Sequence, residues 1–172
     1  MAVEIVNIFV FPTEVYCWVG GIGSTISVWI DNKLNIDLAD DECIDVSARV
    51  YVWTGSRWKF MCGRDVSCII QGPTEVGQMF SFNIINCKVP KCEEFTELPL
   101  KTRLKIEVKY WKFKVTEVHD YTKPPLVSDV KYVEILVKPP ETLKSEIKID
   151  KTKIVKGEAI NISIKLSKQS VM

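Results

Sequence analysis

Residues 104–115, with the sequence LKIEVKYWKFKV, alternate apolar and polar side chains at every second position. One face of this stretch carries only apolar side chains, those of Leu104, Ile106, Val108 and Tyr110. A period of two residues is typical of a half-buried β-strand. After Tyr110 the alternation shifts by one residue, and Trp111 and Phe113 become the apolar set. Because an extra residue in one strand produces such a shift, we expect a β-bulge near Tyr110 and Trp111.

The same period predicts further strands, at residues 24–30, 46–53, 57–61, 77–85 and 130–137. In the first of these, Ile26 and Val28 are expected to point inward and Trp29 outward. Thr54-Gly55-Ser56 is typical of a hairpin turn. Apart from an expected helical turn around residues 92–98, no stretch has a helical period. The sequence therefore predicts an all-β fold.

The N-terminal strand patterns resemble a known family. Pro12-Thr13-Glu14-Val15, then Gly20-Gly21, then residues 25–32 (TISVWIDN) are similar to the first two strands of immunoglobulin-like and CARDB-type adhesion domains. Such domains occur in archaeal surface proteins and in structural proteins of archaeal viruses. The resemblance implies an immunoglobulin-like β-sandwich over most of residues 3–137 and a binding or structural role. It implies no ligand.

Pro139 and Pro140 predict a division of the chain, because consecutive prolines favour a stiff extended linker. We expect a β-sandwich domain at residues 1–138, a linker at 139–144 and a two-stranded C-terminal extension, or arm, at 145–172. One face of the arm alternates strictly in apolar residues, namely Ile160, Ile162, Ile164 and Leu166. Two strands alone are marginal in water, and the sequence stops before a second sandwich is complete. The arm is therefore expected to add strands to a neighbouring subunit; the alternatives are that it folds back onto the first domain or stays disordered until assembly.

Composition narrows the class of protein. The 172 residues carry a net charge of +1, which favours neither nucleic acid nor an acidic membrane as a partner. No segment has the length of a membrane-spanning helix, and the N-terminus lacks the basic start of a signal peptide. Abundant Lys, Glu, Ile and Val are compatible with a thermophilic source.

Six cysteines at positions 17, 43, 62, 68, 87 and 92 allow several chemistries. Gly63-Arg64-Asp65 is typical of a turn, so Cys62 and Cys68 are expected to form a local disulfide. Cys87 and Cys92 flank a second short loop and are expected to form another, which leaves Cys17 and Cys43 for a third. A zinc site made by Cys62, Cys68, Cys87 and Cys92, or free buried thiols, are the alternatives, because spacing does not fix connectivity.

No catalytic constellation is visible, and we expect neither an enzyme nor a cofactor or metal. His119 is the only histidine and lies in a predicted loop, so we expect it to be solvated. The acidic residues from Asp37 to Asp45 are expected to lie in a solvated loop, with calcium binding as the alternative.

Four aromatic side chains are predicted to lie on polar strand faces: Trp29, Tyr51, Trp53 and Trp58. They are expected to pack under loops, to anchor a subunit interface, or to stack on sugar. We therefore expect a structural protein of a virion or extracellular surface appendage, with other protein subunits as partners. An adhesion module that binds carbohydrate or protein is the alternative.

Overall fold

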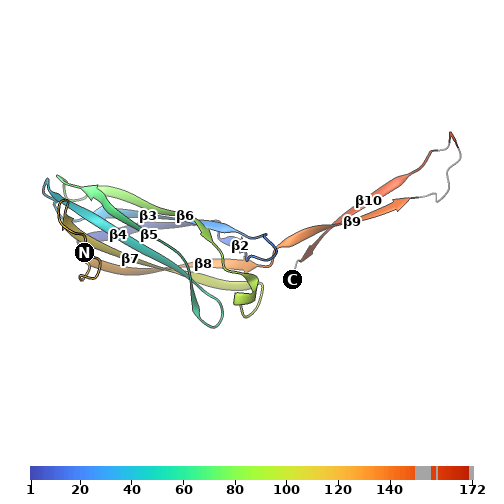
Figure 1. Cartoon of the computed structure of the whole chain (residues 1–172), viewed down its shortest axis with the longest axis horizontal. Helices are drawn as coiled ribbons and strands as arrows, with labels where there is room; N and C mark the ends of the chain where they lie inside the picture. The colour runs from blue at the N-terminus through green and yellow to red at the C-terminus, as the bar shows by residue number, and fades with distance from the viewer. Residues whose placement is uncertain (150–155, 158, 171–172) are drawn as a thin grey trace.

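Ten strands and one 3₁₀ turn make up the described part of the chain in this computed structural model (Figure 1). The structure describes residues 1–149, 156–157 and 159–170. The elements are β1 (Val3–Phe11), β2 (Glu14–Tyr16), β3 (Thr25–Leu34), β4 (Glu42–Trp53), β5 (Trp58–Gln71), β6 (Met79–Lys88), η1 (Cys92–Glu94), β7 (Leu100–Lys114), β8 (Val127–Lys138), β9 (Glu141–Ile149) and β10 (Ile162–Ser170). The all-β prediction is confirmed, and within these ranges no helix is long and apolar enough to cross a membrane.

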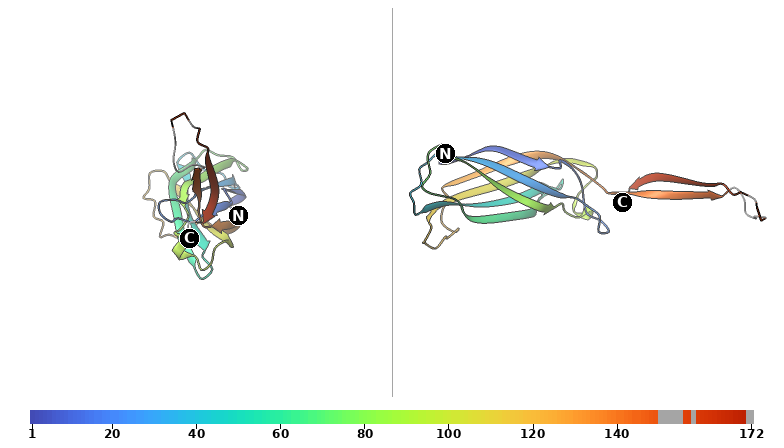
Figure 2. Two further views of the ribbon diagram at one scale, coloured as in Figure 1. Left: turned by 90° about the vertical axis from the view of Figure 1, so that its right-hand side faces the viewer. Right: turned by 90° about the horizontal axis from the view of Figure 1, so that it is seen from above.

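Two sheets enclose the core of the molecule. One has three strands in the order β1-β3-β6, and the other has five in the order β2-β8-β7-β4-β5. Neighbouring strands are antiparallel, except that β2 runs parallel to β8. Buried side chains from both sheets form one apolar cluster. Figure 2 shows the two sheets as layers of one elongated body.

The predicted inward faces are confirmed in the central strands. In β4 the side chains of Val46, Ala48, Val50 and Val52 are all fully buried. In β3 the side chain of Ile26 is buried and that of Trp29 is exposed. Thr54 bonds to Arg57 across the predicted hairpin turn between β4 and β5. Alternation therefore identified which face of each strand meets the core.

The predicted bulge at Tyr110 and Trp111 is wrong. The β4–β7 register runs without a shift from Glu42↔Lys114 to Val52↔Leu104. Tyr110 is buried between the sheets, whereas Trp111 is buried on the opposite, outer face of β7. The outer face is apolar here because the loop at residues 115–126 covers it. The bulges of this sheet lie instead between β4 and β5.

The six cysteines form three disulfides, but their pairing differs from the prediction. The bonds are Cys17–Cys92, Cys43–Cys68 and Cys62–Cys87. The local pairs fail because Gly63 to Asp65 continue β5 instead of forming a turn. The four-cysteine zinc site and the free thiols are wrong as well, since every sulfur is bonded. Three disulfides are typical of a protein in an oxidising, extracellular environment.

One disulfide closes a gap between the two sheets. Cys62 of β5 and Cys87 of β6 lie on edge strands that share no ladder of backbone hydrogen bonds. The Arg64 guanidinium supports the junction by donating to the Asn83 carbonyl at 2.7 Å. The covalent bond thus links two sheet edges that no backbone ladder joins.

The C-terminal extension is an antiparallel hairpin that projects from one end of the body (Figures 1 and 2). β9 begins at Glu141, directly after Pro140, so residues 141–144 belong to a strand and not to the predicted linker. The β9–β10 register runs from Glu141↔Ser170 to Ile149↔Ile162. Residues 150–155, 158 and 171–172 of the predicted arm lie outside the described residues.

Candidate functional site

The outer face of the five-stranded sheet is covered at one end by the loop at residues 115–126. The rings of Trp111 and Tyr121 stack with centroids 4.8 Å apart, and those of Phe113 and His119 stack at 4.7 Å. The Trp111 indole N–H donates to the Lys123 carbonyl at 2.9 Å. These contacts fix the loop on the sheet and create a second buried layer outside the main core.

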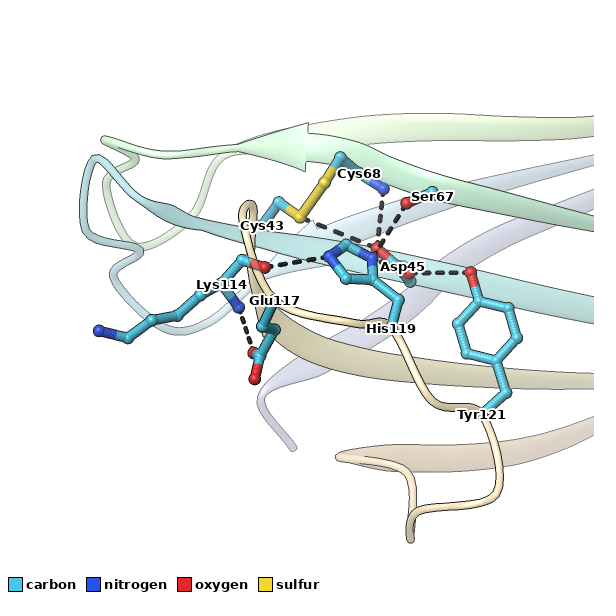
Figure 3. A network of polar contacts seen from close by, with 8 residues as sticks. All are labelled: Cys43, Asp45, Ser67, Cys68, Lys114, Glu117, His119 and Tyr121. Carbon is cyan, nitrogen blue, oxygen red and sulfur yellow. Dashed lines mark hydrogen bonds and ion pairs between the residues drawn. A yellow bond between two sulfur atoms is a disulfide. The ribbon is translucent and has the colours of Figure 1, made fainter.

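Asp45 lies at the centre of this layer (Figure 3). Its side chain is fully buried, and it is an acid in an otherwise apolar part of β4. Oδ1 accepts the backbone N–H of Cys68 at 2.8 Å, and Oδ2 accepts the Tyr121 hydroxyl at 2.8 Å. His119 Nδ1 lies 2.7 Å from the same Oδ2. A buried carboxylate is tolerated here because several donors satisfy its oxygens.

His119 is held by acceptors on both ring nitrogens. Nδ1 faces the Asp45 carboxylate, and Nε2 lies 3.0 Å from the Lys114 carbonyl. Burial lowers the pKa of His119, but the hydrogen bonds to Asp45 and to the Lys114 carbonyl outweigh burial and leave the pKa raised. The imidazolium form can donate from both nitrogens. The expectation that His119 is solvated is therefore wrong.

The same interactions act on Tyr121. Burial, followed by the hydrogen bond to the Asp45 carboxylate, raises the pKa of Tyr121 to about 12. Its hydroxyl thus stays protonated and donates to Asp45 over the whole neutral range. Asp45, His119 and Tyr121 form one fixed polar network.

The network does not have the geometry of a Ser–His–Asp triad. Ser67 Oγ lies 3.0 Å from Nδ1 of His119, the nitrogen that also contacts Asp45. A triad needs the serine on one ring nitrogen and the carboxylate on the other. Since Nε2 contacts a backbone carbonyl, His119 is not positioned to take a proton from Ser67.

The acidic residues around the network do not form one calcium loop. Asp41 pairs with Lys114 at 3.3 Å, and Glu42 pairs with Lys112 at 3.4 Å. Asp45 points into the buried network instead of a solvated loop. These carboxylates therefore contact different partners in the fold.

The structure brings three of the four predicted aromatics together on the outer face of the five-stranded sheet. Trp53 and Trp58 contact edge to face with centroids 5.4 Å apart, and Trp58 lies 6.0 Å from Tyr132. Tyr51 lies beside Phe60, and the ammonium of Lys105 lies 4.7 Å from the Tyr51 ring and 4.9 Å from the Trp58 ring. Next to Trp53 is a shallow groove of about 530 Å³. We call this region the aromatic face: Tyr51, Trp53, Trp58, Phe60 and Tyr132.

Trp29 lies apart from them, on the outer face of the three-stranded sheet. Its register partner on β1 is Phe9, and Phe11 is exposed further along the same strand. All three rings are about half exposed or more, and Phe11 reaches 77%. The outer face of this sheet thus exposes three large apolar side chains.

The hairpin exposes the third apolar surface. Ile162, Ile164 and Leu166 of β10 are 60%, 65% and 62% exposed, and Ile160 just before the strand is 36% exposed. We call these four residues the aliphatic stripe. Lys165 and Lys168 are exposed as well.

No protein-family model matches the chain, and no curated protein matches it significantly.

Proposed function

We propose that this protein is a structural subunit of an extracellular assembly, such as a virion or surface appendage, and that it joins its neighbours through the C-terminal hairpin. The observation that carries the proposal is the aliphatic stripe on a hairpin that projects from the body. Burying each of its larger side chains is worth about 1.5–3 kcal/mol. A two-stranded hairpin in water gains none of that free energy until another surface covers it.

Strand addition is the mode of contact that suits this hairpin. Each strand of a lone hairpin has one edge of unpaired backbone N–H and C=O groups, which can extend the sheet of another subunit. The aromatic rings of Phe9, Phe11 and Trp29 offer a further apolar contact on the body. The three disulfides fit the extracellular setting.

The fold that we propose for the body is an immunoglobulin-like β-sandwich. Two facing sheets of three and five strands around one core support it. Proteins that use such domains place their binding surfaces on loops, strand edges and sheet faces, which agrees with where the exposed apolar residues lie.

The test replaces the stripe without altering the backbone. Ile162→Ser, Ile164→Ser and Leu166→Ser are combined in one variant, and Ser163→Ala with Ser167→Ala on the opposite face of β10 is the matched control. Sedimentation velocity should show the control associating like the wild-type chain and the serine variant remaining monomeric. Equal association of both variants would contradict the proposal.

The aromatic face favours a second candidate, an adhesion module that binds carbohydrate. Phe60 and Tyr132 are more than half exposed, and Arg103 and Lys105 lie over the neighbouring rings. Aromatic rings that stack on sugars, flanked by polar donors, are typical of such sites. Glycan-array binding by the monomer that is lost in Trp58→Ala would support this candidate.

A further inference from the structure

The Asp45 network contains four atoms of the kinds that bind zinc. They are the sulfurs of Cys43 and Cys68, a carboxylate oxygen of Asp45 and Nδ1 of His119, and all lie within 4.8 Å of one another. Cys43 and Asp45 are two residues apart on β4, so their side chains project from the same outer face of the sheet. In the oxidised chain the two sulfurs are bonded to each other. Reduction would turn them into two thiol ligands beside a carboxylate and an imidazole.

A bulge in β5 brings Cys68 to this place. The β4–β5 register passes from Ile44↔Ile70 to Val46↔Val66, so three residues of β5 oppose Asp45 alone. Cys68 has a φ of 49°, in the left-handed region that non-glycine residues rarely adopt. This conformation lets its backbone N–H reach the Asp45 carboxylate. The site is thus fixed by the strand geometry and not by the disulfide alone.

The surroundings of the four atoms match the outer shell of a metal site. A histidine ligand usually donates its second ring N–H to a carbonyl or carboxylate, which orients the ligating nitrogen. The Lys114 carbonyl lies 3.0 Å from Nε2 of His119 and plays this part, while Phe113 stacks on the ring. Tyr121 and the Cys68 N–H orient Asp45 in the same way.

We propose that the reduced chain binds one zinc ion through Cys43, Asp45, Cys68 and His119, and that closing the Cys43–Cys68 disulfide expels it. A dithiol reductant supplies the two electrons and two protons that convert the S–S bond into two thiols, and is itself oxidised to a disulfide. Zinc then displaces one proton from each thiol and the Nδ1 proton of His119. In the reverse direction, a small-molecule disulfide takes the two electrons from the thiolates, the S–S bond forms again, and the ion leaves.

Two sulfurs, one imidazole nitrogen and one carboxylate oxygen are ligands that zinc accepts in four-coordinate sites. Among the residues that the structure describes, no other group of three or more such side chains gathers this closely. Neither of the other two disulfides belongs to such a group among the described residues. Zinc binding should therefore depend on reduction of the Cys43–Cys68 disulfide and not on reduction of the other two.

The experiment titrates the reduced full-length chain with Co²⁺ as an optical probe and then with Zn²⁺ against a chromogenic chelator. The variants are His119→Ala, the pair Cys43→Ser with Cys68→Ser, and the matched pair Cys62→Ser with Cys87→Ser. We expect one ion per chain in the wild-type protein and in the matched pair. His119→Ala should weaken binding by at least about tenfold, and the pair at 43 and 68 should lose the thiolate–cobalt absorption.

Oxidised wild-type protein should bind no ion, and adding a small-molecule disulfide to the zinc-loaded chain should release it. Equal affinity in His119→Ala and the wild-type chain would overturn the proposal, because the metal would then be held by thiols without the folded site. A reduced wild-type chain that unfolds before zinc is added would overturn the proposal as well, because the four ligands would no longer be held together. Unchanged binding after loss of Cys43 and Cys68 would overturn it as well.

Discussion

The five-stranded sheet and the C-terminal hairpin both carry an apolar strand face. At one end of the sheet a loop covers this face, whereas on the hairpin it is exposed. At the covered end, Trp111 and Phe113 lie on an outer face, and the loop at residues 115–126 packs over them. On β10 the aliphatic stripe lies on a similar alternating strand, but no described part of the same chain covers it. One apolar face is thus covered within the chain, and the other is exposed in the described residues.

The difference shows what an apolar outer face requires. The loop brings its own polar groups, His119 and Tyr121, which need a buried acceptor, and Asp45 supplies it. On the described part of β10, exposed lysines flank the stripe instead. We infer that the first region stabilises the fold, whereas the second is the surface that we propose for assembly.

The largest effect on the fold is expected from Asp45→Ala. The change leaves the His119 imidazolium, the Tyr121 hydroxyl and the Cys68 N–H without their common acceptor. Losing one partner of a buried charged pair costs about 3–5 kcal/mol. Chemical denaturation should show this loss in the free energy of unfolding.

The control is Asp65→Ala, which removes the partner of Arg49 at 2.8 Å on the exposed side of the sheet. Exposed ion pairs contribute about 0–1 kcal/mol. If both variants lost the same small amount, the covered end would not be the stabilising region that we describe.

A smaller effect is expected from pH in the oxidised protein. The folded-state pKa of His119 is raised by Asp45 and the Lys114 carbonyl against the lowering effect of burial, with Glu117 nearby adding to the rise. Its contribution to stability is complete below the unfolded pKa of about 6.5 and is lost as pH rises through the higher folded value. Tyr121 titrates near pH 12, outside this window.

Urea denaturation at a series of pH values on both sides of neutrality measures this slope. The wild-type protein should lose stability as the pH rises, and His119→Gln, which cannot titrate, should lose the corresponding part of the slope. The same slope in both proteins would show that His119 is not held as an imidazolium.

The smallest effect on folding is expected from removing residues 141–172. β9 and β10 form a sheet of their own and pair with no strand of the body. The free energy of unfolding of the body should therefore change by no more than about 0.5 kcal/mol, as for a surface change. A large loss of stability on thermal or chemical denaturation would show that the hairpin packs on the body.

Alternation identified the strands and their inner faces because burial in a two-sheet fold follows a period of two. It did not distinguish the two causes of a parity shift at Tyr110 and Trp111. An inserted residue and a covering loop produce the same pattern, and only the position of His119 and Tyr121 over the sheet separates them. An acid between Ile44 and Val46 in an apolar strand was the available signal of a buried partner.

The spacing of the cysteines in the sequence did not predict their pairing, because the pairing depends on which strands are neighbours. Cys62 and Cys87 meet because β5 and β6 are the edges of different sheets, which is a property of the topology. Cys43 meets Cys68 because β4 and β5 are neighbours with a bulge between them. Short separation favours local pairs only where the chain turns, and Gly63 to Asp65 does not turn.

The role of the hairpin in assembly is tested most directly by sedimentation velocity of the full chain and of residues 1–140, over a series of protein concentrations under oxidising conditions. We expect the full chain to associate as its concentration rises, whereas residues 1–140 should remain a folded monomer throughout. A full chain that stays monomeric at every concentration, or a shortened chain that associates equally well, would contradict the assignment of assembly to the hairpin.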